Sequence, residues 1–287
     1  MQPNIVILAG GISSRMKKSV ETASGVDPKL LREAKEKSKA MISVGTGSRP
    51  FLDYVLDNSE KAGYRNICIV VGERDNSIRE YYEGAGAKLF SGIRISYAVQ
   101  TIPPGREKPL GTADALLVAL RAMPEWKGQS LTVCNSDNLY SVNALRLLLD
   151  DMHANSLIDY DRSALKFSAE RISRFAVLAK DSQGFLTGIV EKPAEEEIRR
   201  YTGKNGRIGV SMNLFRFSYD MVLPFLERVP LHPVRQEKEI PTVLNMMIAT
   251  DAHAIYTIPL SEHVIDLTSQ SDILEVKEFL RKEFPNF

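Results

Sequence analysis

The sequence predicts an α/β fold built on an open, mostly parallel mixed sheet with helices on both faces. Short apolar runs rich in β-branched residues, such as residues 4–9 and 66–72, are typical of strands buried on both sides. Segments of helical character separate these runs, and that alternation is the pattern of parallel βαβ units. The predicted architecture is Rossmann-like, and in such sheets ligands bind at the carboxyl ends of the strands.

The first half of the chain supplies four of the predicted strands. Pro50 stands near the first turn of one intervening helix, where its fixed φ and missing N–H are tolerated. Gly111 precedes another helix, whose apolar residues run to about residue 123. The strands are expected at residues 4–9, 66–72, 93–100 and 131–137. The helices are expected at about residues 30–37, from residue 50 onward, at 76–84 and at 112–123.

The second half follows a less regular pattern. Residues 175–179 and 185–190 flank the turn Asp181–Gly184, which is a β-hairpin signal. Further strands are expected at residues 208–217, 254–258 and 263–266. Helices are expected at residues 219–228, 238–249 and 270–283, the second of them interrupted early by Pro241. Because no repeat, low-complexity tract or linker separates the parts, one domain is expected over residues 1–287, in two halves, 1–140 and 141–287.

Composition limits the classes of function. The net charge is +1, so no broad field favours nucleic acid or an acidic membrane surface. No apolar run reaches the roughly 18 residues of a membrane helix, and no signal peptide is recognisable. Cys68 and Cys134 lie in apolar runs and are expected in the core. We therefore expect a cytoplasmic protein whose partners are neither nucleic acid nor membrane.

A glycine turn follows the first predicted strand directly. Gly10 and Gly11 let the backbone turn sharply and approach a ligand closely. Ser13 and Ser14 add hydroxyls, and the exposed N–H groups of such a turn bind phosphate oxygens. Arg15 adds a forked cation suited to phosphate. The stretch has neither P-loop nor dinucleotide glycine spacing; it predicts a triphosphate-binding loop, with a simple turn as the alternative.

Two carboxylates end predicted strands. Asp137 lies in Asn-Ser-Asp-Asn and Asp266 lies in Val-Ile-Asp-Leu. Such residues are often helix caps. If both face one cleft, they supply the hard oxygen ligands that Mg²⁺ prefers, and the ion would bridge phosphates and withdraw charge from the reacting phosphorus. Mg²⁺ is therefore the expected cofactor.

Further polar residues are candidates for ligand binding. Lys192 lies beside Glu191 after a predicted strand, and Pro193 is expected to keep its backbone extended, as a clamp for phosphate and a hydroxylated ring. Gln100 ends a strand and carries an amide that can read a pyrimidine edge. Lys39 is a second candidate cation. The ordinary alternatives are a solvated lysine and a polar strand end.

Taken in order, the motifs resemble those of sugar-phosphate nucleotidylyltransferases of the glucose-1-phosphate thymidylyltransferase or uridylyltransferase type. The resemblance covers nearly the whole chain. It runs through Leu8-Ala9-Gly10-Gly11 with Arg15-Met16, Lys39-Ala40-Met41-Ile42-Ser43-Val44, Gln100, Leu110-Gly111-Thr112-Ala113, Asn135-Ser136-Asp137-Asn138-Leu139-Tyr140, Val190-Glu191-Lys192-Pro193, and Asp266 before Ser271-Asp272-Ile273-Leu274. It implies the nucleotide-diphospho-sugar transferase fold.

The resemblance also implies a reaction: a sugar-1-phosphate oxygen attacks the α-phosphorus of a nucleoside triphosphate in line, giving a nucleoside-diphosphate sugar and pyrophosphate. Arg15 would hold the departing pyrophosphate, Lys39 would contact the phosphates, and Asp137 is the third implied catalytic residue. Asp137 and Asp266 would bind Mg²⁺. The implied nucleotide-binding residues are Leu8, Ala9, Gly10, Gly11, Gln100, Gly111 and Thr112. The implied sugar-phosphate-binding residues are Glu191, Lys192 and Asn213.

The sequence departs from the family pattern in several places. An inserted segment separates Arg15 from Lys39, and Lys29 is a rival for the catalytic lysine, although the residues after Lys39 fit the motif better. Residues that stand where many relatives have glycine are Ala176, Asn213 and Thr268. These replacements leave the sugar undetermined, while Gln100 weakly favours UTP or dTTP.

Two other functions fit the same motifs. One is a non-catalytic regulatory subunit that binds nucleotide sugars. The other is a cytidylyl- or guanylyltransferase acting on a non-sugar phosphate acceptor, which the loop Ser13–Met16 also fits. The sequence leaves open whether the chain forms a homo-oligomer.

Overall fold

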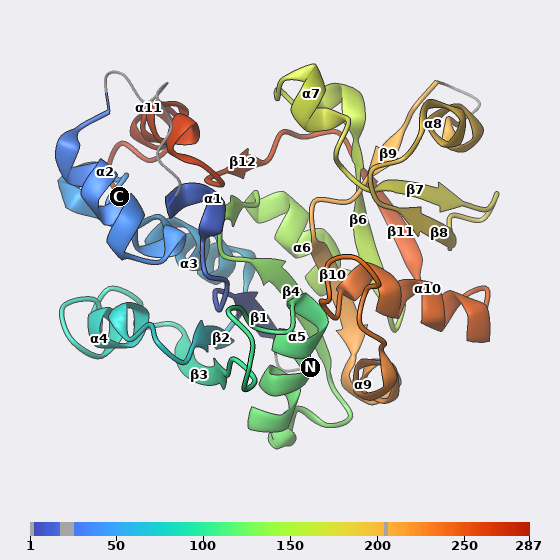
Figure 1. The fold of residues 1–287 in the computed structure, drawn as a ribbon, viewed down its shortest axis with the longest axis horizontal. Coiled ribbons are helices and arrows are strands. Elements are labelled where there is room, and N and C mark those ends of the chain that lie inside the picture. The colour runs from blue at the N-terminus through green and yellow to red at the C-terminus, as the bar shows by residue number, and fades with distance from the viewer. Residues whose placement is uncertain (1–2, 18–25, 204–205) are drawn as a thin grey trace.

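A 10-stranded sheet runs through the molecule and carries helices on both of its faces (Figure 1). The computed structural model describes residues 3–17, 26–203 and 206–287. Along the sheet the strands follow the order β3-β2-β1-β4-β10-β6-β9-β7-β8, and β11 pairs with β6 beside this path. A second, two-stranded sheet pairs β5 with β12.

Pairing is parallel through the first half and largely antiparallel through the second. β1 lies between β2 and β4, parallel to both, and β3 extends this part in parallel. β10 then joins β4 in the antiparallel sense, although β11 runs parallel to β6. The strands are β1 (Asn4–Leu8), β2 (Asn66–Gly72), β3 (Arg94–Gln100), β4 (Ser130–Asn135), β5 (Asn138–Leu139), β6 (Ser156–Asp161), β7 (Val177–Lys180), β8 (Leu186–Val190), β9 (Gly209–Val210), β10 (Leu214–Ser218), β11 (Tyr256–Leu260) and β12 (Ile265–Asp266).

The side chains of β1 alternate between two cores, one on each face of the sheet. Ile5 and Ile7 belong to the core that also contains residues of α3, α6 and α11, whereas Val6 belongs to the core with residues of α5, α9 and α10. Apolar residues are therefore needed from Ile5 to Ile7, because neither face of the strand meets water there. The helices are α1 (Ser14–Lys17), α2 (Pro28–Glu36), α3 (Phe51–Ala62), α4 (Ser77–Glu83), α5 (Thr112–Ala122), α6 (Val142–Asp150), α7 (Ala169–Ile172), α8 (Glu195–Tyr201), α9 (Tyr219–Arg228), α10 (Ile240–Thr250) and α11 (Ile273–Glu283).

The predicted mixed sheet with helices on both faces is confirmed, and both cysteines are buried as expected. The second half differs in detail. The strand expected at residues 208–217 is two strands, β9 and β10, separated by a break in which Asn213 has a φ of +58°. Pro241 lies in the first turn of α10 and does not interrupt it, because the first helical N–H groups need no intrahelical acceptor. β6 and α6 were not predicted.

Within the described ranges, every helix is too short or too polar to span a bilayer. Part of the polar stretch at residues 17–39 lies outside the described residues, and the helix expected there at 30–37 is α2.

Candidate functional site

Two adjoining clefts open at the carboxyl ends of β1 and β4. The smaller has a volume of about 370 Å³ and the larger about 860 Å³. Arg15, Asn135 and Asp137 line both clefts, so they mark the boundary between them. All the residues expected to bind nucleotide line the smaller cleft, and all those expected to bind sugar phosphate line the larger one. The structure therefore brings together the residues that the motifs selected.

The glycine turn is held in place by two distant residues. Ser13 adopts the left-handed conformation, with a φ of +56°, and its hydroxyl accepts a hydrogen bond from Lys39 N at 3.3 Å. Gln270 is 2% exposed, and its amide nitrogen donates to Met16 O at 2.9 Å. These contacts connect α1, which carries Arg15, both to Lys39 and to the segment before α11.

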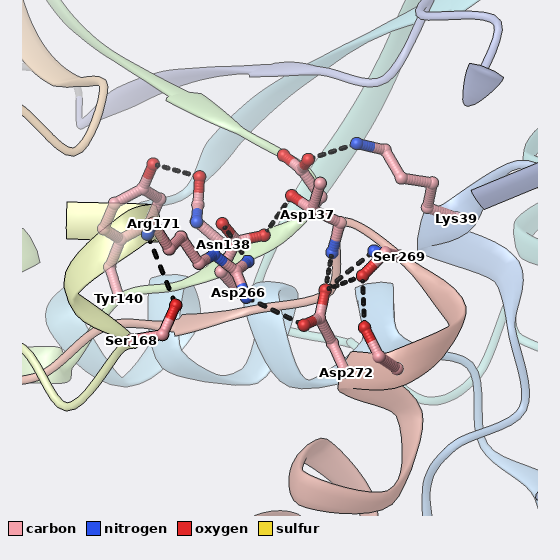
Figure 2. Close-up of polar contacts among 11 residues, drawn as sticks. Lys39, Asp137, Asn138, Tyr140, Ser168, Arg171, Asp266, Ser269 and Asp272 are labelled. Atoms are coloured by element: carbon pink, nitrogen blue, oxygen red, sulfur yellow. Dashed lines mark hydrogen bonds and ion pairs between the residues drawn. The ribbon is translucent and has the colours of Figure 1, made fainter. Parts of the chain in front are cut away.

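Lys39 points at Asp137, and their side chains form an ion pair (Figure 2). Both side chains are largely buried, so the contact is partly shielded from water. Lys29, by contrast, is exposed on α2, lies 3.5 Å from the Ser48 hydroxyl, and lines neither cleft. Of the two rival lysines, the structure brings only Lys39 to the clefts; its role in catalysis stays a prediction.

Asp266 lies beside Asp137 because β12 pairs with β5. Asp266 is opposite Asn138 in this ladder, and Leu267 N donates to Asp137 O at 2.8 Å. Burial, and then the negative charge of Asp137, raise the pKa of Asp266 above its ordinary value, while the nearby Arg171 acts in the opposite direction. Carboxylates from two remote parts of the chain thus share one site.

This donor set fits Mg²⁺. The ion is commonly held by one or two protein carboxylates, with water and substrate phosphates supplying its other ligands. Among residues 3–17, 26–203 and 206–287, no group of three or more His, Cys, Asp or Glu side chains is arranged to hold a metal. The repulsion between Asp137 and Asp266 is what a cation bound between them would relieve.

Gln100 is fixed in one orientation at the smaller cleft. It is 3% exposed, and its amide nitrogen donates to Gly111 O at 2.9 Å and to the Asp114 carboxylate at 2.8 Å. Both partners can only accept, so the amide cannot flip without losing both bonds. Gly10 packs closely against it, since a Cβ there would lie 3.0 Å from Gln100 Oε1. The amide oxygen is the atom left for a ligand.

The remaining residues of the smaller cleft have clear structural contacts. Leu8 ends β1, and Ala9 N donates to Val70 O at 2.9 Å, which carries the pairing of β1 with β2 one residue further. Thr112 opens α5, and its hydroxyl accepts a hydrogen bond from Ile240 N at 3.2 Å. The binding roles expected for these residues stay predictions.

At the larger cleft, the expectation for the Lys192 backbone is wrong. Lys192 has a φ of +48° and is not extended. A following proline disfavours the right-handed α region but does not exclude the left-handed one. Asn213 is also left-handed, and asparagine tolerates this conformation better than most residues, so it can occupy a position that is glycine in the family pattern.

Sequence reasoning missed two arginines that line the larger cleft. Arg235 forms ion pairs with Glu191 and with Glu239, the second at 2.7 Å. Arg171, on α7, contacts Asp266 at 2.7 Å. Neither arginine lies in a predicted helix or strand; the only available signal was the spacing of Arg235 four residues before Glu239, which is common on any helix.

Comparisons with known proteins identify the family of the chain. A family model described as nucleotidyl transferase matches residues 29–283. The bifunctional protein GlmU of Staphylococcus saprophyticus is 24% identical over 252 residues, covering 86% of this chain and 46% of that protein. A glucose-1-phosphate adenylyltransferase of Koribacter versatilis is 22% identical over 208 residues, covering 71% of this chain and 49% of that protein. The chain thus spans about half the length of these curated relatives.

Solved structures share the fold over the whole chain. A UDP-glucose pyrophosphorylase complexed with UDP-glucose has a TM-score of 0.71 at 16% identity, covering 99% of this chain and 100% of that one. The UTP-bound UGPase of Acinetobacter baumannii has a TM-score of 0.69 at 18% identity, covering 100% and 95%. The nucleotide-diphospho-sugar transferase fold is therefore confirmed. Because the family model matches most of its length, the chain belongs to the nucleotidyl transferase family.

Proposed function

We propose that the protein is a Mg²⁺-dependent nucleotidylyltransferase that joins a nucleoside triphosphate to a sugar-1-phosphate, giving a nucleoside-diphosphate sugar and pyrophosphate. The placement of Asp137 supports this most directly: it lies at the boundary of the two clefts, paired with Lys39 and beside Asp266. An acceptor in the larger cleft and a triphosphate in the smaller one would meet at that boundary.

The chain's own residues supply positioning and positive charge. Arg15 and Lys39 would neutralise the triphosphate, and Lys192 would hold the acceptor phosphate so that its oxygen approaches the α-phosphorus. Mg²⁺ held by Asp137 and Asp266 would neutralise developing charge on the phosphates. Glu191 and Asn213 would contact the acceptor ring. Because the chemistry needs little beyond charge and alignment, these residues suffice for in-line transfer.

The fixed amide of Gln100 supports UTP or dTTP over CTP. Its nitrogen is engaged by Gly111 and Asp114, so only an acceptor oxygen is offered to a base. Uracil and thymine carry an N–H at the centre of their pairing edge, whereas cytosine carries a bare acceptor nitrogen there. An acceptor facing an acceptor leaves a buried polar atom unpaired and costs affinity.

Pyrophosphate release tests the proposal. The protein is incubated with Mg²⁺, each of UTP, dTTP, ATP, GTP and CTP, and a panel of sugar-1-phosphates together with a polyol phosphate and phosphocholine. We expect release with UTP or dTTP and a sugar-1-phosphate. Lys39→Met and Asp137→Asn should lower the rate by about 10²–10³, as expected for lost transition-state electrostatics, whereas the matched control Lys29→Met should keep it. Nucleotide binding without release from any pair would instead favour a regulatory subunit.

The same proposal includes a cytoplasmic location, which the two buried, unpaired thiols and the near-neutral net charge support. Whether the enzyme forms a homo-oligomer is a separate question for size-exclusion chromatography with light scattering.

A further inference from the structure

Arg171 lies between the carboxylates of Asp266, one of the two proposed metal ligands, and Asp272 (Figure 2). Its Nη2 lies 2.7 Å from Asp266 Oδ2, and its Nη1 lies 2.7 Å from Asp272 Oδ1. Its Cζ lies 4.5 Å from the centre of the Phe167 ring. The Arg171 side chain is 25% exposed, and these contacts hold its guanidinium on several sides.

The two carboxylates are anchored by their other oxygens. Asp272 Oδ2 accepts hydrogen bonds from Thr268 N at 2.9 Å and Ser269 N at 2.7 Å, which caps the segment before α11. Asp266 Oδ1 accepts from the Thr268 hydroxyl. Asp266 Oδ2, which faces Arg171, is therefore the oxygen that could exchange the arginine for a metal ion.

Asp137 also has a cationic partner, because Lys39 forms an ion pair with it. Each of the two carboxylates proposed to hold Mg²⁺ is thus already neutralised by a cation of the chain. A divalent cation that enters alone must compete with both of these charges at close range. A triphosphate changes the balance, since its oxygens attract Lys39 and add ligands to the ion.

We propose that Arg171 is a positioning residue that serves as the resident counter-cation of Asp266. It holds this carboxylate in the free protein and keeps the affinity for free divalent cations low, so that the metal binds together with the triphosphate. The inference rests on the proposed function for the assignment of Asp137 and Asp266 to the metal. It predicts a dependence of metal affinity on nucleotide that a merely structural arginine would not produce.

Metal binding without turnover tests this. Binding of Mn²⁺ is measured by calorimetry and electron paramagnetic resonance, with and without α,β-methylene-UTP, and with no acceptor present. For the natural protein we expect weak binding of Mn²⁺ alone and binding at least tenfold tighter with the analogue. For Arg171→Gln we expect Mn²⁺ alone to bind about tenfold more tightly than to the natural protein, because a nearby positive charge is gone, and the effect of the analogue to shrink accordingly.

Arg174→Gln is the matched control. Arg174 lines the same cleft and is paired with Glu170, but both are well exposed, and it forms no ion pair with Asp137 or Asp266. Its Mn²⁺ affinity should equal that of the natural protein. Unchanged or weaker Mn²⁺ affinity in a natively folded Arg171→Gln protein would overturn the inference.

A second neutral variant, Arg171→Met, is used in case Arg171→Gln does not fold. Arg171→Met keeps the aliphatic stem against Phe167 and carries the same expectation. If both variants unfold in EDTA, recovery of the fold with Mn²⁺ supports the inference, because the metal then replaces the missing charge, and no recovery overturns it.

If the natural protein binds no Mn²⁺ with any nucleotide triphosphate analogue, the proposed function itself fails; if metal binding behaves as expected but no pyrophosphate is released, only the enzymatic assignment fails.

Discussion

Glu239, the ion-pair partner of the cleft residue Arg235, shows how a single carboxylate responds to burial. Burial, and then the negative charge of Glu191, raise the pKa of Glu239 to about 7. Glu237 acts in the same direction, whereas the charges of Arg235 and Lys108 oppose it. Glu239 is 8% exposed, so a proton on its carboxyl is favoured over much of the acidic range.

The sign of the resulting pH effect follows from linkage. A carboxyl whose pKa is higher in the folded protein contributes stability that is complete below its ordinary value of 4.5 and is lost as the pH rises through about 7. We expect Glu239→Gln to remove this loss, so the urea midpoint of the variant relative to the natural protein should rise from pH 5 to pH 8. Urea unfolding at several pH values measures it. A difference in urea midpoint that stays the same at every pH, whatever its size, would contradict a raised pKa of Glu239.

At the scale of elements, the loop between β3 and α5 and the loop before α10 meet at the start of α5. Lys238 O accepts a hydrogen bond from Ala113 N at 3.0 Å, which ties the loop before α10 to the first turn of α5. Gly111 lies at this junction with a φ of +106° and a ψ of −169°, a region that only glycine occupies readily. A Cβ there would lie 2.6 Å from Lys238 O. The loop that holds Gln100 in orientation therefore depends on a glycine.

Gly111→Ala tests this junction against Gly105→Ala. The first substitution should destabilise the fold by about 1–3 kcal/mol through backbone strain, with the contact to Lys238 adding to that, and should weaken nucleotide binding. Gly105 lies in the same loop with a φ of +79° and open space around it, so its substitution should cost about 1–2 kcal/mol and leave nucleotide affinity unchanged. Urea unfolding and nucleotide titration of both variants give the comparison. Equal losses of nucleotide affinity would argue against a specific role for Gly111.

The elements that the sequence predicted are those in which one local signal dominates. β1 and β2 are apolar at nearly every position, and Pro50 marks the start of α3. In these elements the local sequence favours the same structure that the tertiary fold requires. β6 was missed because it contains Asp159, a fully buried carboxylate whose partners come later in the chain: Lys180 ends β7, and Arg207 lies in the loop before β9. A sequence pattern does not show that such a charge is compensated.

The same distinction applies to the site. The glycine turn, Lys39 and Asp137 stand in short motifs that can be recognised in a single sequence. The structure places these residues at one cleft. Arg171 and Arg235 lie on a four-residue helix and in a loop, where no periodicity selects them. Their importance comes from which carboxylates the fold places beside them, and that depends on long-range pairing.

At the scale of the whole molecule, the two halves are not separate in space. β10, from the second half, pairs with β4 from the first over five residue pairs, from Leu214 with Cys134 to Ser218 with Ser130. The closing helix α11 returns beside α2 and α3, at the opposite end of the molecule from β7 and β8 (Figure 1), and its Val276 belongs to the same core as Ile5. Both cores contain residues from both halves. Asp137 and Asp266, the two proposed metal ligands, come one from each half.

This arrangement predicts that the chain unfolds in one cooperative step. Trp126 is the only tryptophan and lies in the first half of the sequence, so its fluorescence reports one buried position in a core, whereas far-UV circular dichroism reports helices from the entire chain. If the shared sheet and cores couple the halves, the two signals should give coincident urea transitions, with one midpoint and one slope. Independent halves would separate them, because the dichroism would then change at a urea concentration where the fluorescence does not. The comparison also decides the domain prediction, since one domain over residues 1–287 requires that neither half keep its structure when the other is lost.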